Sequence, residues 1–189
     1  MELVTARLLL REFTAEDLPA VTAYQSDPRY TEFVGPEESG PEFTRSLLEL
    51  FMRWSTEQPR QNYQLAVVER TSSPELIGCA GVRCGGCEPG CAEFGLELAP
   101  RRWGRGFATE VARALLGFAF QDLGQHTVIA VSVTQNHRIT RLLSKLGFRS
   151  TVSRPGPDWM RDRGFDETEW RLTADEWRAT ASRQGAAHG

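Results

Sequence analysis

The stretch Pro100-Arg-Arg-Trp-Gly-Arg-Gly-Phe-Ala-Thr-Glu110 decides the fold of this chain. A strand pattern ends just before it, and from Phe107 to about Leu123 apolar residues recur at helical spacing. Gly104 and Gly106 let the backbone curl closely around a ligand. The helix that starts there points free N–H groups and the positive end of its dipole at that curl. The stretch therefore predicts an anion site fitted to a diphosphate.

Other phosphate loops fit this stretch less well. A Walker loop requires Gly-Lys-Ser/Thr, which does not follow here. The spacing Gly104-x-Gly106-x-Ala108 lacks the full dinucleotide pattern, and the strands before it form a meander rather than a βαβ unit. Taken alone, the stretch also fits a glycine-rich turn from strand to helix that binds nothing.

The rest of the chain is assigned outward from this stretch by its apolar periodicity and its turn residues. Before the stretch we expect strand 3–13, a helix opened by Thr14 and ending near residue 25, a helix over about 42–57, and strands 62–69, 75–82 and 92–98. After it we expect strand 127–133, a helix over about 137–146 closed by Gly147, strands 148–153 and 167–172, and a last helix through residue 177 that starts with a capping box at Thr173.

This order of elements indicates an α/β (α+β) fold. A strand–helix–strand segment joined to a meander predicts a single mixed, mostly antiparallel sheet of about 6–7 strands with helices on both faces. Ligands bind such sheets where a strand ends and a helix begins, which here is segment 98–106. No linker divides the chain, so we expect one domain over residues 1–181 and a disordered tail over 182–189.

Composition restricts the functions open to the chain. It has 189 residues, 40% of them hydrophobic, and a formal net charge of −3. This charge argues against a nucleic-acid partner, because nucleic-acid-binding domains usually carry a basic footprint. No stretch approaches the roughly 20 apolar residues that cross a bilayer, and charges interrupt the apolar N-terminus. We therefore expect a cytoplasmic protein without a membrane partner.

Four cysteines, at positions 79, 84, 87 and 91, lie within 13 residues. The pair Cys84-x-x-Cys87 has the spacing of zinc ligands, but no second pair of this kind exists, and Cys79 lies within a strand pattern. Semi-buried thiols on a hairpin are the simpler interpretation. We expect no metal. A Cys84–Cys91 disulfide across the hairpin is a further alternative.

Four segments carry a family resemblance: TARLLLREFTAEDLPAV (5–21), AEFGLELAPRRWGRGFATEVARALLGFAF (92–120), TQNHRITRLLSKLGF (134–148) and WRLTADEW (170–177). The chain resembles the GNAT acetyltransferases, and within them the RimJ/RimL branch of ribosomal-protein N-terminal acetyltransferases. The acyl-CoA loop of that family reads Gln/Arg-x-x-Gly-x-Gly/Ala. Gly106 and Ala108 fill its later positions, and Trp103, which that branch often has, stands where Gln or Arg is usual.

The resemblance implies the GNAT fold and acetyl-CoA as cosubstrate. Backbone amides from Arg105 to Glu110 should hold the pyrophosphate, and Leu98 with its neighbours should hydrogen-bond the pantetheine arm. Asn136 matches a CoA-contacting asparagine; it also fits an ordinary helix N-cap, and both can be true. The expected CoA-binding residues are Leu98, Ala99, Arg102, Trp103, Gly104, Arg105, Gly106, Phe107, Ala108, Thr109, Glu110, Asn136 and Arg141.

The reaction requires one group to deprotonate the attacking amine and one to stabilise the oxyanion. Strand alternation predicts that Glu97 can be the base, directly or through water; the alternative is a solvated or ion-paired strand residue. By family analogy the backbone N–H of Leu98 is the oxyanion donor, and transfer is direct within a ternary complex. The chain departs from the family at Leu143, where many relatives place the tyrosine that protonates the thiolate, and at Ile139, where serine is usual.

Three functions follow from these observations. The first is an N-acetyltransferase acting on a protein N-terminus or a small-molecule amine, as a monomer or homodimer. The second, motivated by the missing tyrosine, is a CoA-binding or regulatory module without catalysis, and the third is a nucleotide-binding domain. Segments 26–46 and 154–166 should wall the acceptor cleft. Possible lining residues are Tyr30, Phe33, Trp54, Trp159 and Phe165, each of which also fits an ordinary core.

Overall fold

The computed structural model describes the backbone of residues 1–186 and the side chains of residues 1–180. Its elements follow one another in the order β1 (Glu2–Val4), β2 (Leu8–Arg11), η1 (Ala15–Asp17), α1 (Leu18–Gln25), α2 (Pro28–Thr31), η2 (Pro36–Glu38), α3 (Pro41–Thr56), β3 (Asn62–Glu69), β4 (Glu75–Arg83), β5 (Cys91–Leu98), η3 (Pro100–Arg102), α4 (Phe107–Gly117), η4 (Phe118–Asp122), β6 (Thr127–Val133), α5 (His137–Leu146), β7 (Arg149–Pro155), α6 (Asp158–Arg161), β8 (Asp166–Thr173) and α7 (Ala174–Ala186).

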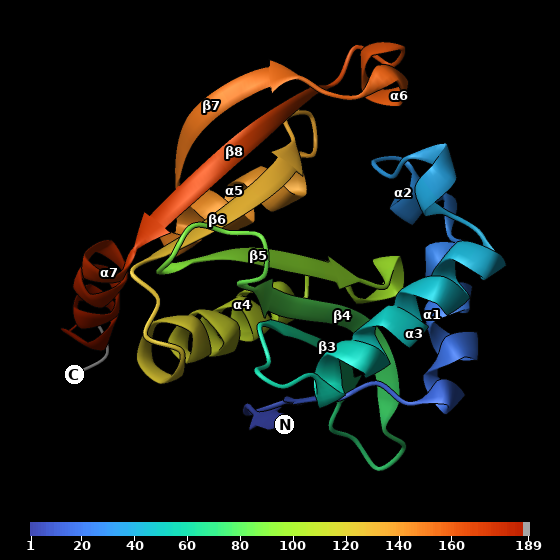
Figure 1. Cartoon of the computed structure of the whole chain (residues 1–189), viewed down its shortest axis with the longest axis horizontal. Helices are drawn as coiled ribbons and strands as arrows, with labels where there is room; N and C mark the ends of the chain where they lie inside the picture. The colour runs from blue at the N-terminus through green and yellow to red at the C-terminus, as the bar shows by residue number, and fades with distance from the viewer. Residues whose placement is uncertain (187–189) are drawn as a thin grey trace.

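The strands form one mixed sheet of eight in the order β1-β2-β3-β4-β5-β6-β8-β7 (Figure 1). All neighbours are antiparallel except β5 and β6, which are parallel. The prediction of six to seven strands is corrected because segment 3–13 is two strands. Thr5 turns the chain between them: its N–H donates to Leu8 O (2.9 Å), and Leu8 N–H donates to Thr5 Oγ1 (3.0 Å).

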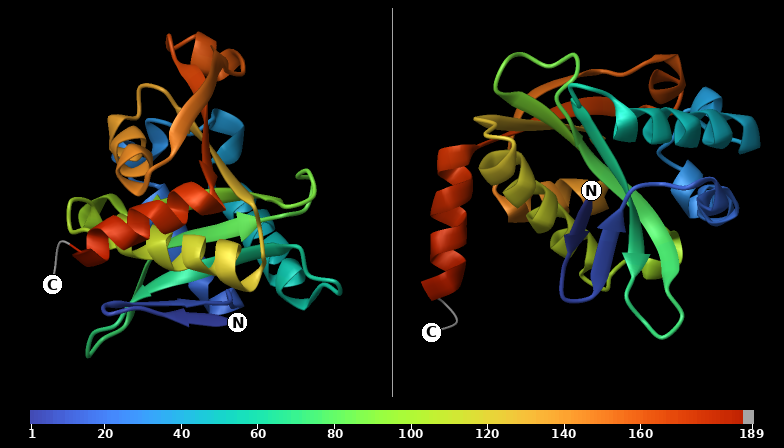
Figure 2. Two further views of the ribbon diagram at one scale, coloured as in Figure 1. Left: turned by 90° about the vertical axis from the view of Figure 1, so that its left-hand side faces the viewer. Right: turned by 60° about the horizontal axis from the view of Figure 1, so that its bottom comes forward.

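Helices cover both faces of the sheet, as predicted (Figures 1 and 2). On one face, α4 and α5 pack on a core that includes the fully buried Leu115 and Leu143. On the other face, α1 and α3 pack on a second core that contains Val21, Leu48 and Cys79. Each face is closed by helices whose apolar side is turned to the sheet, which is how a two-sided sheet buries its side chains.

Strands β5 and β6 separate along their length. They pair only at one end, from Cys91↔Thr127 to Glu93↔Ile129. Beyond Glu93 strand β5 continues beside β4, whereas β6 continues beside β8, and the two diverge towards the right of Figure 1. The second half of β5 therefore has no strand partner on its β6 side. The loop to α4 and the start of α5 both lie at this opening.

The C-terminal helix is longer than predicted. The capping box at Thr173 is confirmed: Thr173 N–H donates to Glu176 Oε2 (3.0 Å), and Glu176 N–H donates to Thr173 Oγ1 (3.3 Å). However, α7 continues to Ala186, so residues 182–186, predicted as a disordered tail, are helical. Residues 187–189 of that predicted tail lie outside the described residues.

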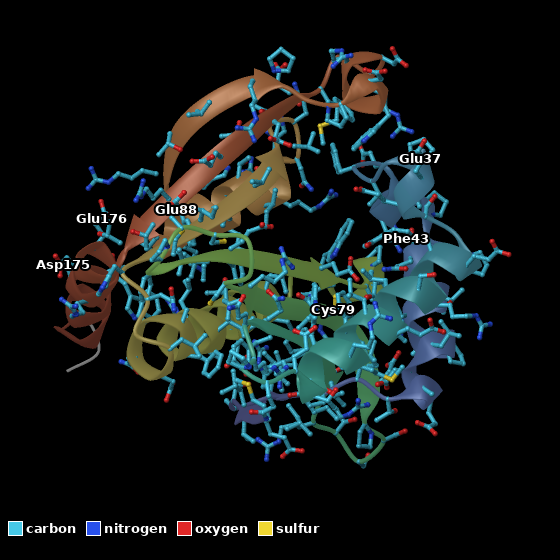
Figure 3. The ribbon with its side chains drawn as sticks, in the orientation of Figure 1. Glu37, Phe43, Cys79, Glu88, Asp175 and Glu176 are labelled. Carbon is cyan, nitrogen blue, oxygen red and sulfur yellow. The ribbon has the colours of Figure 1, made fainter. Side chains whose placement is uncertain are left out.

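The cysteines form no bridge and are free thiols. Cys84, Cys87 and Cys91 lie in or beside the β4–β5 hairpin loop, whose Glu88 is well separated from Cys79 in Figure 3. Within the described part of the chain, no three His, Cys, Asp or Glu side chains are grouped to hold a metal ion. No helix within residues 1–186 has the length and apolarity needed to cross a membrane.

Candidate active site

A cleft of about 610 Å³ opens where β5 and β6 diverge. This volume is within the usual range of small-molecule sites. One wall comes from α2 and the segment after it, the floor from the end of β5, and the other walls from the loop to α4 and from α5. Its lining residues are Arg29, Tyr30, Phe33, Val34, Leu96, Glu97, Leu98, Arg102, Trp103, Gly104, Gly106, Phe107, Ala108, Thr109, Asn136, Arg138, Ile139, Arg141, Leu142 and Lys145.

The loop into α4 has the predicted shape. Gly104 and Gly106 adopt positive φ angles of 76° and 81°, a conformation that strongly favours glycine, and Gly106 is the N-cap of α4. The first helical hydrogen bond runs from Glu110 N–H to Gly106 O (3.2 Å), so the amides that precede Glu110 are left without helical partners. The expectation for the Glu110 amide is therefore corrected, because that N–H is already bonded.

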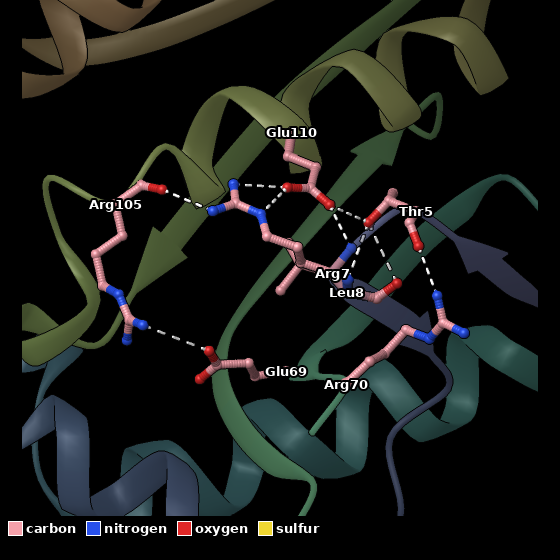
Figure 4. Close-up of polar contacts among 7 residues, drawn as sticks. All are labelled: Thr5, Arg7, Leu8, Glu69, Arg70, Arg105 and Glu110. Carbon is pink, nitrogen blue, oxygen red and sulfur yellow. Dashed lines mark hydrogen bonds and ion pairs between the residues drawn. The ribbon is translucent and has the colours of Figure 1, made fainter. Parts of the chain in front are cut away.

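The Glu110 side chain has a different role, which is to tie the loop to the N-terminal hairpin (Figure 4). Its Oε1 accepts from Thr5 Oγ1 (2.6 Å) and Arg7 N–H (2.8 Å), and its Oε2 accepts from Arg7 Nε (2.7 Å). Arg7 Nη1 in turn donates to Arg105 O (3.0 Å), within the loop itself. Burial raises the pKa of Glu110, but the bonds from Thr5 and Arg7 more than offset this, and the net shift is downward.

Helix α5 supplies the cations of the cleft. Arg138, Arg141 and Lys145 are exposed along the side of α5 that lines it. Among the described residues none of the three has an acidic partner, and Arg138 lies over the Trp103 ring at 4.5 Å. The cleft-lining face of α5 is therefore available to an anionic ligand.

The arginines of the loop are less available. Arg102 lines the cleft but pairs with Glu69 (3.0 Å) and Glu75 (2.5 Å). The Arg105 guanidinium lies outside the cleft lining, 3.8 Å from Glu69 and over the Phe107 ring. The predicted CoA contacts of these two arginines would therefore compete with existing ion pairs.

The end of β5 presents the backbone of Leu98 to the cleft. Ala99 N–H donates to Ile77 O of β4 (2.7 Å), and alternation along an antiparallel pair turns the N–H and C=O of Leu98 the other way, towards the opening. The indole Nε1 of Trp103 donates to that carbonyl (2.8 Å). Ala99 itself, expected to bind the cofactor, is fully buried with its N–H bonded to β4, which corrects that prediction.

Asn136 lines the cleft and also caps α5, where its Oδ1 accepts from Ile139 N–H (3.4 Å). The N-cap interpretation is confirmed, and the cleft position leaves a ligand contact open. Leu143, which stands where relatives have tyrosine, is completely buried. No proton donor reaches the cleft from that position.

Glu97 is held by four donors, none of them cationic. Its Oε1 accepts from Tyr24 Oη (2.5 Å), Gln25 Nε2 (3.1 Å) and Cys79 Sγ (3.1 Å), and its Oε2 accepts from Tyr30 Oη. A carboxylate has about four lone-pair positions, so Oε1 is saturated, whereas Oε2 can accept one further donor. Glu97 is half-buried and lines the cleft. It is neither freely solvated nor ion-paired, which were the two alternatives to a base.

No positive charge balances Glu97 within the described residues. Arg83, on the neighbouring strand, is paired with Glu93 (2.6 Å). Burial, followed by the nearby charge of Glu97, raises the pKa of Tyr24, Tyr30 and Cys79, so these groups remain protonated donors. A desolvated carboxylate with only neutral partners favours a cation, and the cleft is where one can approach it.

The acceptor walls differ from the prediction at three of the five proposed aromatic positions. Tyr30 and Phe33 line the cleft. Trp54 instead packs in the α1–α3 core against Phe51. The other two, from segment 154–166, pack against the segment that follows α2: the Phe165 ring lies 5.5 Å from Phe33, and Trp159 lies against Gly35. Arg163 also donates to Glu32 O (3.0 Å), so the two predicted walls contact each other.

Known proteins share this architecture. Residues 7–149 match the family profile described as "Acetyltransferase (GNAT) domain". The protein named "Uncharacterized N-acetyltransferase YoaA" of Bacillus subtilis (strain 168) is 33% identical over 148 residues, which span 78% of this chain and 82% of that protein. A GNAT-family acetyltransferase structure from Bacillus anthracis is 23% identical with a TM-score of 0.74, over 92% of this chain and 98% of that one.

The structure of a "putative ribosomal-protein-serine acetyltransferase" from Vibrio cholerae is 18% identical, with a TM-score of 0.70 over 92% of this chain and 97% of that one. At such identities a structural likeness establishes the fold alone. The profile and the B. subtilis relative establish more. This chain belongs to the GNAT family and is an acetyltransferase.

Proposed function

We propose that the protein transfers an acetyl group from acetyl-CoA directly to a primary amine, with both substrates bound in one ternary complex. The observation that carries this proposal is Glu97, a carboxylate that lines the cleft and that, among the described residues, has neutral donors and no counter-ion. An acceptor amine arrives as an ammonium ion at neutral pH. Glu97 can bind that cation and then remove its proton.

The other end of the cleft suits acetyl-CoA. Free amides at the start of α4 and the dipole of that helix favour a diphosphate, and the three cations of α5, which have no acidic partner among the described residues, lie on the same side. Hydrogen bonds to a charged acceptor stabilise it by about 1.5–3 kcal/mol each. The Leu98 backbone, turned into the opening, can hydrogen-bond an extended pantetheine arm as a neighbouring strand would.

These groups divide the reaction between them. Glu97 takes a proton from the nitrogen, the nitrogen attacks the thioester carbonyl carbon, and the Leu98 N–H stabilises the oxyanion. The C–S bond then breaks with its electron pair on sulfur. The protein mainly holds the two reactants in line, and such positioning can supply ~7–11 kcal/mol of the barrier.

The finer assignments are also proposals. We place the chain in the RimJ/RimL branch because Trp103 precedes Gly104-x-Gly106 in its acyl-CoA loop. The acceptor is then a protein N-terminus or a small amine, and the contact between segments 26–46 and 154–166 limits how it enters. We propose a cytoplasmic monomer or homodimer that requires no metal.

Thiol release from acetyl-CoA with a panel of amines tests the function: 2-phenylethylamine, spermidine and a short peptide with N-terminal serine. Glu97→Gln should lower kcat/KM by about 10²–10⁴-fold and leave acetyl-CoA binding intact by calorimetry. Glu93→Gln is the matched control, because Glu93 lies on the same face of β5 but outside the cleft lining. Binding of acetyl-CoA with no turnover of any amine would favour a CoA-binding module instead.

A further inference from the structure

The leaving thiolate requires a proton, and the usual donor of the family is missing. Leu143 occupies that position and is completely buried. A thiol has a pKa near 8.5, so the sulfur ends as a thiol at neutral pH, and its protonation as the C–S bond breaks makes it a better leaving group. A proton donor must therefore come from another element that lines the cleft.

Tyr30, in α2, is the lining residue placed for this role. Its hydroxyl donates to Glu97 Oε2, the carboxylate oxygen that has only this one partner. Of the described residues that line the cleft, it is the only phenol, and none is a cysteine or histidine. We propose that Tyr30 is a second catalytic residue, which passes the proton collected by Glu97 to the leaving sulfur. This inference rests on the proposed function.

Tyr24 provides an internal comparison. Its hydroxyl also donates to Glu97, but on Oε1, where Gln25 and Cys79 donate as well. Tyr24 is 2% exposed, and it does not line the cleft. The two rings meet edge to face at 5.7 Å. Two tyrosines therefore donate to the two oxygens of one carboxylate, and of these two only Tyr30 lines the cleft.

The proton transfers balance without any further reactant. The ammonium form of the acceptor first gives one proton to Glu97, which releases it to solvent. The nitrogen lone pair then bonds to the carbonyl carbon, and the C=O π electrons move to oxygen. When the tetrahedral intermediate collapses, Glu97 accepts the second nitrogen proton and the C–S pair stays on sulfur. Sulfur takes the hydroxyl proton of Tyr30, and the phenol oxygen takes the proton held by Glu97.

The pairing with Glu97 explains how a tyrosine can serve. Burial and the adjacent charge of Glu97 raise the pKa of Tyr30, so alone it would be a poor acid. Once Glu97 carries the amine proton, that charge is gone, and the phenol receives a proton as it gives one up. The groups that face Tyr30 here are Glu97, Tyr24, Gln25 and Cys79. None of them is cationic, so none would stabilise a tyrosinate.

The test compares Tyr30→Phe with Tyr24→Phe, because each variant removes one hydroxyl from Glu97. With acetyl-CoA and the best amine of the panel, Y30F should lose about 10²-fold or more in kcat at little change in KM, the usual worth of an acid catalyst. Y24F, which only loosens Glu97, should lose less. Melting temperature and calorimetric acetyl-CoA affinity show that both variants fold and bind.

A second acetyl donor separates proton transfer from positioning. S-acetyl-4-nitrothiophenol releases a far more acidic thiol, which leaves without protonation. Its use should remove most of the Y30F defect while leaving those of Y24F and Glu97→Gln. Equal losses in Y30F and Y24F, or a Y30F defect that persists with the acidic leaving group, would reduce Tyr30 to a positioning residue. Failure of the wild-type protein to acetylate any amine would instead refute the proposed function itself.

Discussion

Replacing Glu110 with glutamine tests how the N-terminal hairpin holds the acyl-CoA loop. The carboxylate accepts from Thr5 Oγ1, Arg7 N–H and Arg7 Nε, and Arg7 also holds the loop carbonyl of residue 105 (Figure 4). Glutamine keeps the size of the side chain but removes its charge. The charge-assisted bonds then become neutral ones, which are roughly half as strong.

The size of the effect follows from the exposure of the partners. The Arg7 side chain is 49% exposed, so its ion pair with Glu110 adds only about 0.2–1 kcal/mol. The bonds from Thr5 and from the Arg7 backbone should each weaken by about 0.5–1.5 kcal/mol. We therefore expect E110Q to lower the free energy of unfolding by about 2 kcal/mol, and Tm by about 4–8 °C for a domain of this size.

The pH dependence gives a sharper test. The pKa of Glu110 is lowered in the folded protein, so its contribution is fully present above the unfolded-state value of about 4.3 and is lost as pH falls through the folded-state value. The difference in Tm between wild type and E110Q should be constant at neutral pH and close in acid. Glu49→Gln, at an exposed position on α3, is the control. A Tm difference no larger than that of E49Q, or one that persists in acid, would refute this account.

Three further changes probe the cleft. Arg141→Gln should weaken acetyl-CoA binding by roughly two- to fivefold and reduce its salt dependence; unchanged calorimetric Kd at low salt would contradict the role of α5. Trp103→Phe removes the hydrogen bond from the indole to Leu98 O. Because such a bond contributes ~1 kcal/mol, the KM for acetyl-CoA should rise about fivefold. An effect on the KM for the amine alone would assign Trp103 to the acceptor side. Arg163→Ala breaks the contact with Glu32 O and should change the KM for the amine but not the Kd for acetyl-CoA. A changed Kd for acetyl-CoA with an unchanged KM for the amine would exclude an acceptor-side role.

Several elements were predictable because their signals are local. The structure has β3 over 62–69, β6 over 127–133 and α5 over 137–146, the residues expected from sequence. The β-branched residues of β6 favour a strand at their own positions, and the left-handed Gly147 ends α5 where it stands. The loop at Gly104 and Gly106 was predictable for the same reason, because these two glycines allow the positive φ angles with which the chain enters the helix.

The surroundings of Glu97 could not be predicted in this way. Its donors Tyr24 and Gln25 are 73 and 72 residues away in sequence, and Cys79 is 18 away on the paired strand. Their convergence depends on how α1 packs across β4, which no spacing in the sequence records. The one available signal was register, because in an antiparallel pair Cys79 lies directly opposite Glu97. Strand alternation gave the face of Glu97 but not its partners.

The distribution of charge along the cleft explains why one opening can serve two unlike reactants. The cations of α5 and the free amides of α4 lie on the sheet face that carries these helices, whereas Glu97 faces α1 and α2. An anionic diphosphate is attracted to the first side and repelled by Glu97, and an ammonium ion has the opposite preference. The charges that bind one reactant therefore repel the other, which keeps each reactant on its own side of the cleft. In the ternary complex that we propose, the two meet where β5 and β6 part, beside Leu98, and the gap between these strands would let the carbonyl carbon and the nitrogen approach across the sheet.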